Sequence, residues 1–173
     1  MIDNRVTNLS RREADIALRM FRPTQLELVA KRLRDVPLGL FAHRDYLAQF
    51  GEPQRLDDIA GHTLIGFDQD PSWLAMLRQL RLKVEDFGFR TDSLMAQIHA
   101  IDSATGIGGA QVAIAERYPA WQRVLPQVPL PPLELWLVSH SDVRKDPAVR
   151  CVLGELECFL SAAGTNPDPS GRE

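Results

Sequence analysis

The stretch VPLGLFAHRDY, from Val36 to Tyr46, decides the fold that the sequence predicts. Nearly every position up to Ala42 is apolar, so both faces of this segment are expected to be buried. That pattern is typical of a strand inside a covered sheet rather than of a half-exposed ribbon. Pro37 has no N–H to donate to a ladder, so it belongs at the start of the strand or at a sheet edge. Polar residues then end the run, and a helix is predicted over Tyr46–Phe50.

Strand and helix signals alternate along the rest of the chain. Strands are predicted at residues 14–18, 26–33, 62–67, 86–90, 121–125 and 133–138, with a short strand or turn at 107–109. Helices are predicted at residues 9–13, 56–60, 72–82, 94–105, 112–118 and 148–160. This alternation favours an α/β architecture with mostly parallel sheets.

The composition is ordinary for a soluble globular protein of one domain or two small ones. The formal charge of −3 offers no basic face of the kind that grips nucleic acid. No apolar run approaches the length of a membrane span, and residues 1–12 lack the apolar core of a signal peptide. We therefore expect a cytoplasmic protein without membrane contact.

The two cysteines, Cys151 and Cys158, lie seven residues apart on a predicted helix. They share a face of that helix but are separated by about 10 Å along its axis. This separation is too large for a disulfide. We expect both to be buried core thiols.

A search for catalytic chemistry finds no constellation. The four histidines, His43, His62, His99 and His140, each stand without a second ligand at metal spacing, and neither a nucleophile elbow nor a P-loop is present. The TGIGG segment at residues 105–109 lacks the third glycine of the dinucleotide fingerprint at its spacing, so it indicates a tight turn with close packing. The sequence predicts no enzyme, no cofactor and no metal site.

Helix starts are the more informative feature. Ligands of α/β sheets gather outside the carboxyl ends of strands, where helix N-termini favour carboxylates and phosphates. Two predicted helix starts carry suitable side chains. Thr91, Asp92 and Ser93 follow one strand, and His43, whose ring nitrogens can donate or accept a hydrogen bond, follows another. Simple capping of the helix by Asp92 or Ser93 explains the first group equally well.

The order of these segments resembles the effector-binding region of LysR-type transcriptional regulators. No single motif decides this; the order and spacing of several do, and the resemblance extends to about Ala163. The segments are ADIALR (14–19), the YL pair (46–47), DDIAGH (57–62), GIG (106–108) and the final strand LELWLV (133–138).

The resemblance implies two Rossmann-like subdomains of the type 2 periplasmic-binding-protein kind, joined by two crossover strands. Subdomain I would comprise residues 1–35 and 139–163, subdomain II residues 36–138, and residues 164–173 would form a disordered tail. A small effector, often a carboxylate or an aromatic acid in this family, would bind the cleft between the subdomains. The positions that match the family's cleft are Asn4, His43, Thr91, Asp92, Ser93, Thr105 and Gly106.

Two departures from the family pattern shape our expectations. The N-terminal winged helix-turn-helix is not in this sequence, so we expect no specific DNA binding by the chain itself. The family's first strand and the loop that follows it are also not in this sequence. We therefore expect an N-terminally truncated, incomplete subdomain I, in which the strand around Ile16 and Leu18 has an open edge and exposed apolar side chains.

Other functions remain open at this stage. The chain could act only by dimerising with intact regulators, or it could form a homodimer. A small α/β enzyme would need a paired acid/base or nucleophile constellation, and a solute-binding protein would need a secretion signal. The sequence shows neither feature.

Overall fold

The structure is a computed structural model that describes residues 14–25, 27–69, 73, 77, 82–142 and 145–162. The chain forms two compact units. Unit 1 combines the described residues up to Val36 with those from Leu133 onward, and unit 2 spans Pro37–Pro132. The sequence-based division placed residues 133–138 with the second subdomain. In the structure they belong to unit 1, because they are part of a strand whose described partner strands both lie in unit 1.

Unit 1 contains a sheet of three described strands, β1 (Ile16–Arg19), β2 (Leu28–Val36) and β8 (Leu133–His140), in the order β1-β8-β2. Both pairings are antiparallel, so the expectation of mostly parallel sheets is wrong for this unit. The reason is topological. β2 carries the chain toward unit 2 and β8 brings it back, and the two strands lie side by side with Val36 opposite Leu133.

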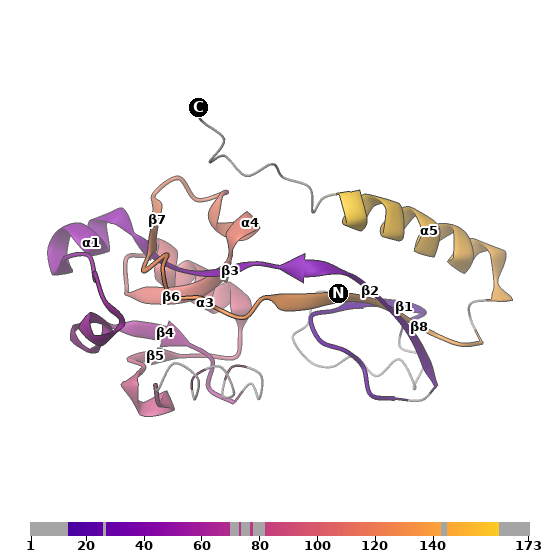
Figure 1. The fold of residues 1–173 in the computed structure, drawn as a ribbon, viewed down its shortest axis with the longest axis horizontal. Helices are drawn as coiled ribbons and strands as arrows, with labels where there is room; N and C mark the ends of the chain where they lie inside the picture. The colour runs from indigo at the N-terminus through magenta and orange to yellow at the C-terminus, as the bar shows by residue number, and fades with distance from the viewer. Residues whose placement is uncertain are drawn as a thin grey trace. The chain divides into compact units, whose positions relative to one another are not determined.

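Helix α5 (Pro147–Ala162) packs on one face of this sheet (Figure 1). Leu153 is buried, and the Lys31 ammonium on β2 donates a 2.7 Å hydrogen bond to the Glu157 carboxylate on the helix. The expectation of buried cysteines is wrong, since Cys151 and Cys158 are both exposed. Cys151 lies two residues before Leu153, about 160° away around the helix, so it faces away from the sheet.

Unit 2 contains a sheet of five described strands in the order β5-β4-β6-β3-β7. Its strands are β3 (Leu38–His43), β4 (Leu64–Gly66), β5 (Phe89–Arg90), β6 (Ile107–Gln111) and β7 (Trp121–Val124). β4 runs parallel to both β5 and β6, whereas β3 runs antiparallel to β6 and β7. The sheet is therefore mixed, with a parallel part formed by β5, β4 and β6.

The strand predicted from the opening stretch is confirmed as β3. Phe41 is 5% exposed and Ala42 is fully buried, and they belong to two different core clusters. One cluster includes Tyr46 and Leu47 of α1 (Arg44–Phe50), and the other includes residues of α3 (Leu94–Asp102). The alternation of side chains along β3 thus supplies both layers of the core of unit 2.

The remaining helical segments of unit 2 are short. Those that the structure describes over their whole length are the 3-10 helices η2 (Leu56–Gly61) and η3 (Val84–Asp86) and the helix α4 (Val112–Ala115). Helix α3 ends earlier than residue 105, because Ala104 adopts a left-handed conformation with φ 56°. The Thr105 N–H then bonds the Ala100 carbonyl and the Ala104 N–H bonds the Ile101 carbonyl, which is the Schellman arrangement.

Three sequence-based expectations lie outside the described residues. These are the helix at residues 9–13, the disordered tail at 164–173 and most of the helix at 72–82, of which only Trp73, Leu77 and Leu82 are described. Among the described helices, none combines the length and the apolar character needed to span a bilayer.

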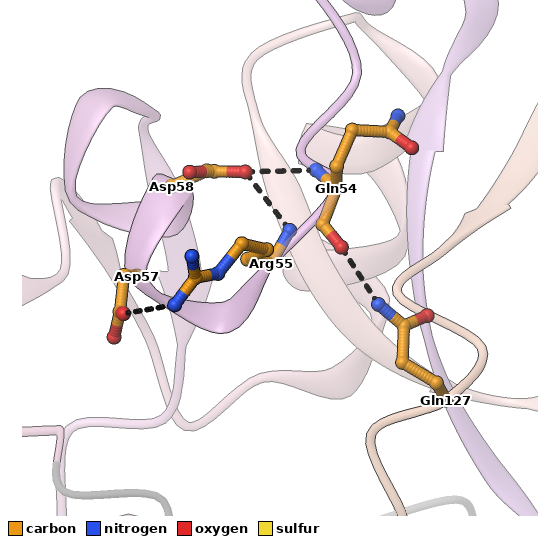
Figure 2. A network of polar contacts seen from close by, with 5 residues as sticks. All are labelled: Gln54, Arg55, Asp57, Asp58 and Gln127. Carbon is orange, nitrogen blue, oxygen red and sulfur yellow. Dashed lines mark hydrogen bonds and ion pairs between the residues drawn. The ribbon is translucent and has the colours of Figure 1, made fainter.

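Asp58 holds the start of η2 in place (Figure 2). Its carboxylate accepts hydrogen bonds from the backbone N–H of Arg55 at 2.8 Å and of Gln54 at 3.0 Å. The Gln127 side chain donates to the Gln54 carbonyl at 2.8 Å, which ties the same corner to the segment after β7. The two backbone hydrogen bonds to the carboxylate lower the pKa of Asp58 below its usual value, and the one from the Arg55 N–H contributes most.

We predict that Asp58→Asn lowers the thermal midpoint of unit 2 at neutral pH. A lowered pKa in the folded state means that the Asp58 carboxylate stabilises the fold above its unfolded pKa of about 4, and that this contribution is lost as the pH falls through the lower folded pKa. The midpoint difference between wild type and variant should therefore shrink in acid. Asp57→Asn is the matched control, because the neighbouring exposed Asp57 contacts only the Arg55 guanidinium, at 3.4 Å, among the contacts described for it. A midpoint difference that is constant from pH 7 to pH 3 would contradict the assignment.

Candidate functional site

The structure separates the predicted site residues into two groups. Asn4 lies outside the described residues. Thr91, Asp92 and Ser93 directly follow the carboxyl end of β5, whereas His43, Thr105 and Gly106 lie at the opposite edge of the same sheet. A single small-molecule ligand therefore cannot contact both groups at once.

The strand directions establish these two edges. Ala42 pairs with Ile107 and Leu38 pairs with Gln111, so the end of β3 lies beside the start of β6. Because β4, β5 and β6 are parallel, their carboxyl ends share the other edge. Helix α3 has nine residues, so about 13 Å separates its start after Ser93 from its end. We call the two edges the carboxyl edge and the amino edge.

At the carboxyl edge, backbone contacts fix the Thr91–Ser93 turn. The Thr91 N–H bonds the Gly66 carbonyl at the end of β4 at 3.0 Å. The Thr91 carbonyl accepts a 2.8 Å hydrogen bond from the side-chain amide of Gln97, which is only 2% exposed. A buried glutamine of α3 therefore holds this turn against the end of the sheet.

The three side chains of this turn all accept hydrogen bonds from backbone N–H groups. The Thr91 hydroxyl accepts from the Ser93 N–H at 3.2 Å, and the Ser93 hydroxyl caps α3 by accepting from the Ala96 N–H at 3.3 Å. Asp92 accepts from the N–H groups of Asp68 and Gln69, both at 3.0 Å. The capping role considered from the sequence is thus confirmed for Ser93.

Sequence reasoning did not single out Asp68, Gln69 and Arg90, which share the carboxyl edge. Asp68 and Gln69 follow β4, and Arg90 is the last residue of β5. The Arg90 guanidinium lies 3.4 Å from the Asp68 carboxylate. The available signal was the rule already used for Thr91, since Asp68 and Gln69 come just after a predicted strand.

The carboxyl edge retains hydrogen-bond donors. A hydroxyl that accepts one hydrogen bond still has its own O–H to donate. Among the described residues, the Thr91 and Ser93 hydroxyls donate to no acceptor. The first N–H groups of a helix also have no intrahelical acceptor, and the first turn of α3 carries no acidic residue. This edge is therefore suited to an acceptor group such as a carboxylate.

At the amino edge, the predicted site residues have structural partners. His43 caps α1, with its Nδ1 accepting from the Asp45 N–H at 3.1 Å. Gly106 is buried, and a Cβ at this position would lie 2.2 Å from the Thr63 carbonyl oxygen. The predicted tight turn with close packing is confirmed at Gly106, while Thr105 beside it is exposed.

A small apolar cavity of about 20 Å³ lies in the core of unit 2. It has about the volume that one water molecule needs, so it is too small for an organic effector. Its lining includes Leu40, Leu64, Phe87 and Ile107. Within the described part of the chain, no group of three or more His, Cys, Asp or Glu side chains is arranged to hold a metal ion.

Comparison with known proteins identifies the family. The family model described as the LysR substrate binding domain matches residues 2–160. The chain belongs to this family. A similar curated protein, the HTH-type transcriptional regulator CrgA of Neisseria meningitidis, is 38% identical over 65 residues, which are 38% of this chain and 22% of CrgA. The match thus spans about a fifth of that regulator's length.

Solved structures share the fold of this LysR substrate-binding domain. The CrgA regulatory domain from Neisseria meningitidis gives a TM-score of 0.77 at 24% identity, covering 91% of this chain and 78% of that one. The structure of CrgA itself gives 0.77 at 26% identity and covers 88% and 54%. The effector domain of AmpR from Pseudomonas aeruginosa gives 0.70 at 18% identity and covers 95% and 82%. The fold is therefore the two-lobed α/β fold of LysR regulatory domains, as predicted.

Proposed function

We propose that this chain is an effector-sensing domain that binds a small organic acid in the cleft between its two lobes, with the carboxyl edge of unit 2 as one side of the site. Membership of a family of transcription-regulator domains supports the sensing role. The observation that carries the site is the fixed Thr91–Ser93 turn, which combines two hydroxyl donors with the start of α3.

The chain's path supports the choice of this edge. The chain enters unit 2 at Pro37 just before Leu38, and Leu38 pairs with Gln111 at the end of β6. The carboxyl ends of β4, β5 and β6 therefore lie at the edge where the chain comes in. His43, Thr105 and Gly106 lie one strand length away, so we leave them out of the proposed site.

An acid fits this edge better than a neutral or basic compound. The helix start favours a negative group, and the hydroxyls of Thr91 and Ser93 donate to its oxygens. The Arg90 guanidinium lies 3.4 Å from the Asp68 carboxylate, which balances its charge, and the Asp92 carboxylate accepts hydrogen bonds from backbone N–H groups of the 68–69 loop. Other residues of the proposed cleft would select the aromatic or aliphatic remainder of the ligand.

The test is a thermal-shift screen of small carboxylates and aromatic acids, followed by calorimetric titration of each hit. We expect the double variant Thr91→Ala/Ser93→Ala to weaken a hit by roughly 10- to 100-fold, because two charge-assisted hydrogen bonds are lost. Loss of the Ser93 cap also costs about 1 kcal/mol of stability.

His43→Ala is the matched control, since it removes a helix cap at the opposite edge. It should lower stability similarly and leave affinity unchanged. Affinity that survives the double variant but falls with His43→Ala would move the site to the amino edge. A screen without any hit, on protein shown to be folded by circular dichroism, would count against effector binding by this chain.

A further inference from the structure

Arg34 on β2 carries a positive charge for which the described residues supply no anionic partner. Its side chain is half-buried, and its Nε atom is shielded from solvent without a hydrogen-bond acceptor. A buried donor without an acceptor is costly, and a charged one more so. The place of this guanidinium in the fold therefore points to an acceptor that the described residues do not provide.

The strand register shows which face of the unit 1 sheet carries Arg34. Leu135 and Leu137 lie on the same face of β8, because they are two residues apart. Lys31 pairs with Leu137 and bonds Glu157 of α5, so this is the face on which the helix packs. Arg34 pairs with Leu135 and therefore lies on this face too. Both leucines are buried, so the sheet next to Arg34 is apolar.

A β-bulge places the guanidinium on this face. Side chains alternate along a regular strand, so counting from Lys31 would bring Leu33 to the α5 face and Arg34 to the other one. The register shifts between Arg32 and Arg34, and this shift reverses the alternation. Bulges commonly redirect a side chain in this way next to functional sites. The strand thus departs from regular pairing beside the residue whose charge lacks a partner.

The carboxylates that neighbour this position in the two strands lie on the opposite face. Asp35 and Glu134 pair with each other across β2 and β8. Both form ion pairs with the Arg32 guanidinium, and the Arg32 Nε lies 3.3 Å from the Glu134 carboxylate. Arg32 therefore has two carboxylate partners, whereas the sheet separates Arg34 from both of them.

We propose that Arg34 anchors an oxyanion-binding site on the α5 face of unit 1, which takes the carboxylate of a small acid or an inorganic anion of the same chemistry. A guanidinium matches the paired oxygens of a carboxylate, sulfate or phosphate group. The bound oxyanion accepts the Nε–H and neutralises the charge. This site is separate from the carboxyl edge of unit 2 and does not depend on the proposed effector site.

Calorimetric titration of the full chain with sodium sulfate, sodium phosphate and sodium benzoate, at an ionic strength held constant with sodium chloride, tests the site. We expect Arg34→Met to weaken binding by about 10-fold or more, because charge-assisted hydrogen bonds are lost. Arg34→Lys should also weaken binding, since an ammonium keeps the charge without the planar geometry. Binding of all three salts would support a site for free anions, and binding of benzoate alone would support a site for an acid with an apolar body.

The melting midpoint without added oxyanion gives a second readout, which changes in the opposite direction. Arg34→Met should raise the midpoint in sodium chloride by about 2 °C or more, because an apolar chain replaces a buried donor without an acceptor. Arg32→Met is the matched control. It removes a guanidinium that has two carboxylate partners on the other face, so it should not raise the midpoint and should leave oxyanion affinity unchanged.

Four results would overturn the proposal. The first is a folded protein that binds none of the three anions at millimolar concentration. The second is binding that Arg34→Met and Arg32→Met weaken equally. The third is binding that survives Arg34→Met but is lost in Thr91→Ala/Ser93→Ala, which would assign the anion to the carboxyl edge of unit 2. The fourth is a midpoint that Arg34→Met lowers, because the chain itself would then supply the acceptor.

Discussion

Gly106→Ala is expected to destabilise unit 2 by about 3 kcal/mol or more, because the new methyl group meets the backbone itself. The Cβ would lie 2.2 Å from the Thr63 carbonyl oxygen and 3.0 Å from the Thr63 carbonyl carbon. The Thr63 oxygen also accepts the Ile107 N–H at 2.9 Å, at the start of the β4–β6 pairing. No rotamer change relieves this contact, so the two strands must separate where they begin.

Urea denaturation followed by tryptophan fluorescence measures this effect. A Trp136→Phe background removes the tryptophan of unit 1 and leaves Trp73 and Trp121, both in unit 2. Gly61→Ala is the control, since a Cβ at Gly61 meets nothing within 4 Å. It should change the free energy of unfolding by no more than about 0.5 kcal/mol. A Gly106→Ala variant as stable as Gly61→Ala would show that β4 and β6 do not approach in this way.

Ile101→Ala is expected to cost about 3–4 kcal/mol, because Ile101 on α3 is fully buried and its removal leaves a cavity. Ile101 packs on Gly108 of β6, where a Cβ would lie 2.8 Å from the Ile101 Cδ1 atom. Gly108→Ala alone should therefore cost about 1–3 kcal/mol by overpacking. The two substitutions affect the same space in opposite directions.

A double-mutant cycle tests whether Ile101 and Gly108 contact each other or contribute to stability independently. The double variant Ile101→Ala/Gly108→Ala should cost less than the sum of the single changes by at least about 1 kcal/mol, because the alanine methyl at 108 fills part of the cavity. Met95→Ala on the same helix is the control, since Met95 is 53% exposed and should contribute little. Strict additivity of the two core changes would mean that α3 does not pack on Gly108.

Much of the fold follows from patterns that a single sequence carries. The apolar run up to Ala42 requires a strand with two covered faces, and the structure gives Phe41 and Ala42 separate core clusters. The Thr-Asp-Ser sequence before Leu94 predicts a helix start, and Ser93 caps α3. These features depend on residues close together in the chain, so local propensity and periodicity identify them.

The pairing of strands was harder to predict. Parallel sheets were expected because strands and helices alternate, yet β1, β8 and β2 are antiparallel. The prediction that Cys151 and Cys158 are buried was wrong for a related reason. Their spacing indicates a shared helix face, but which face meets the sheet depends on Leu153 and the Lys31–Glu157 ion pair.

The sequence by itself determined the family, the alternation of strands and helices, and the residue types at the helix starts. It could not determine which of those starts lie together. His43 and Ser93 both cap helices that follow strands. However, β3 is oriented antiparallel to β4, β5 and β6, so the two caps lie at opposite edges of one sheet. Strand direction arises from pairings between residues far apart in the chain, and only the tertiary structure decides it.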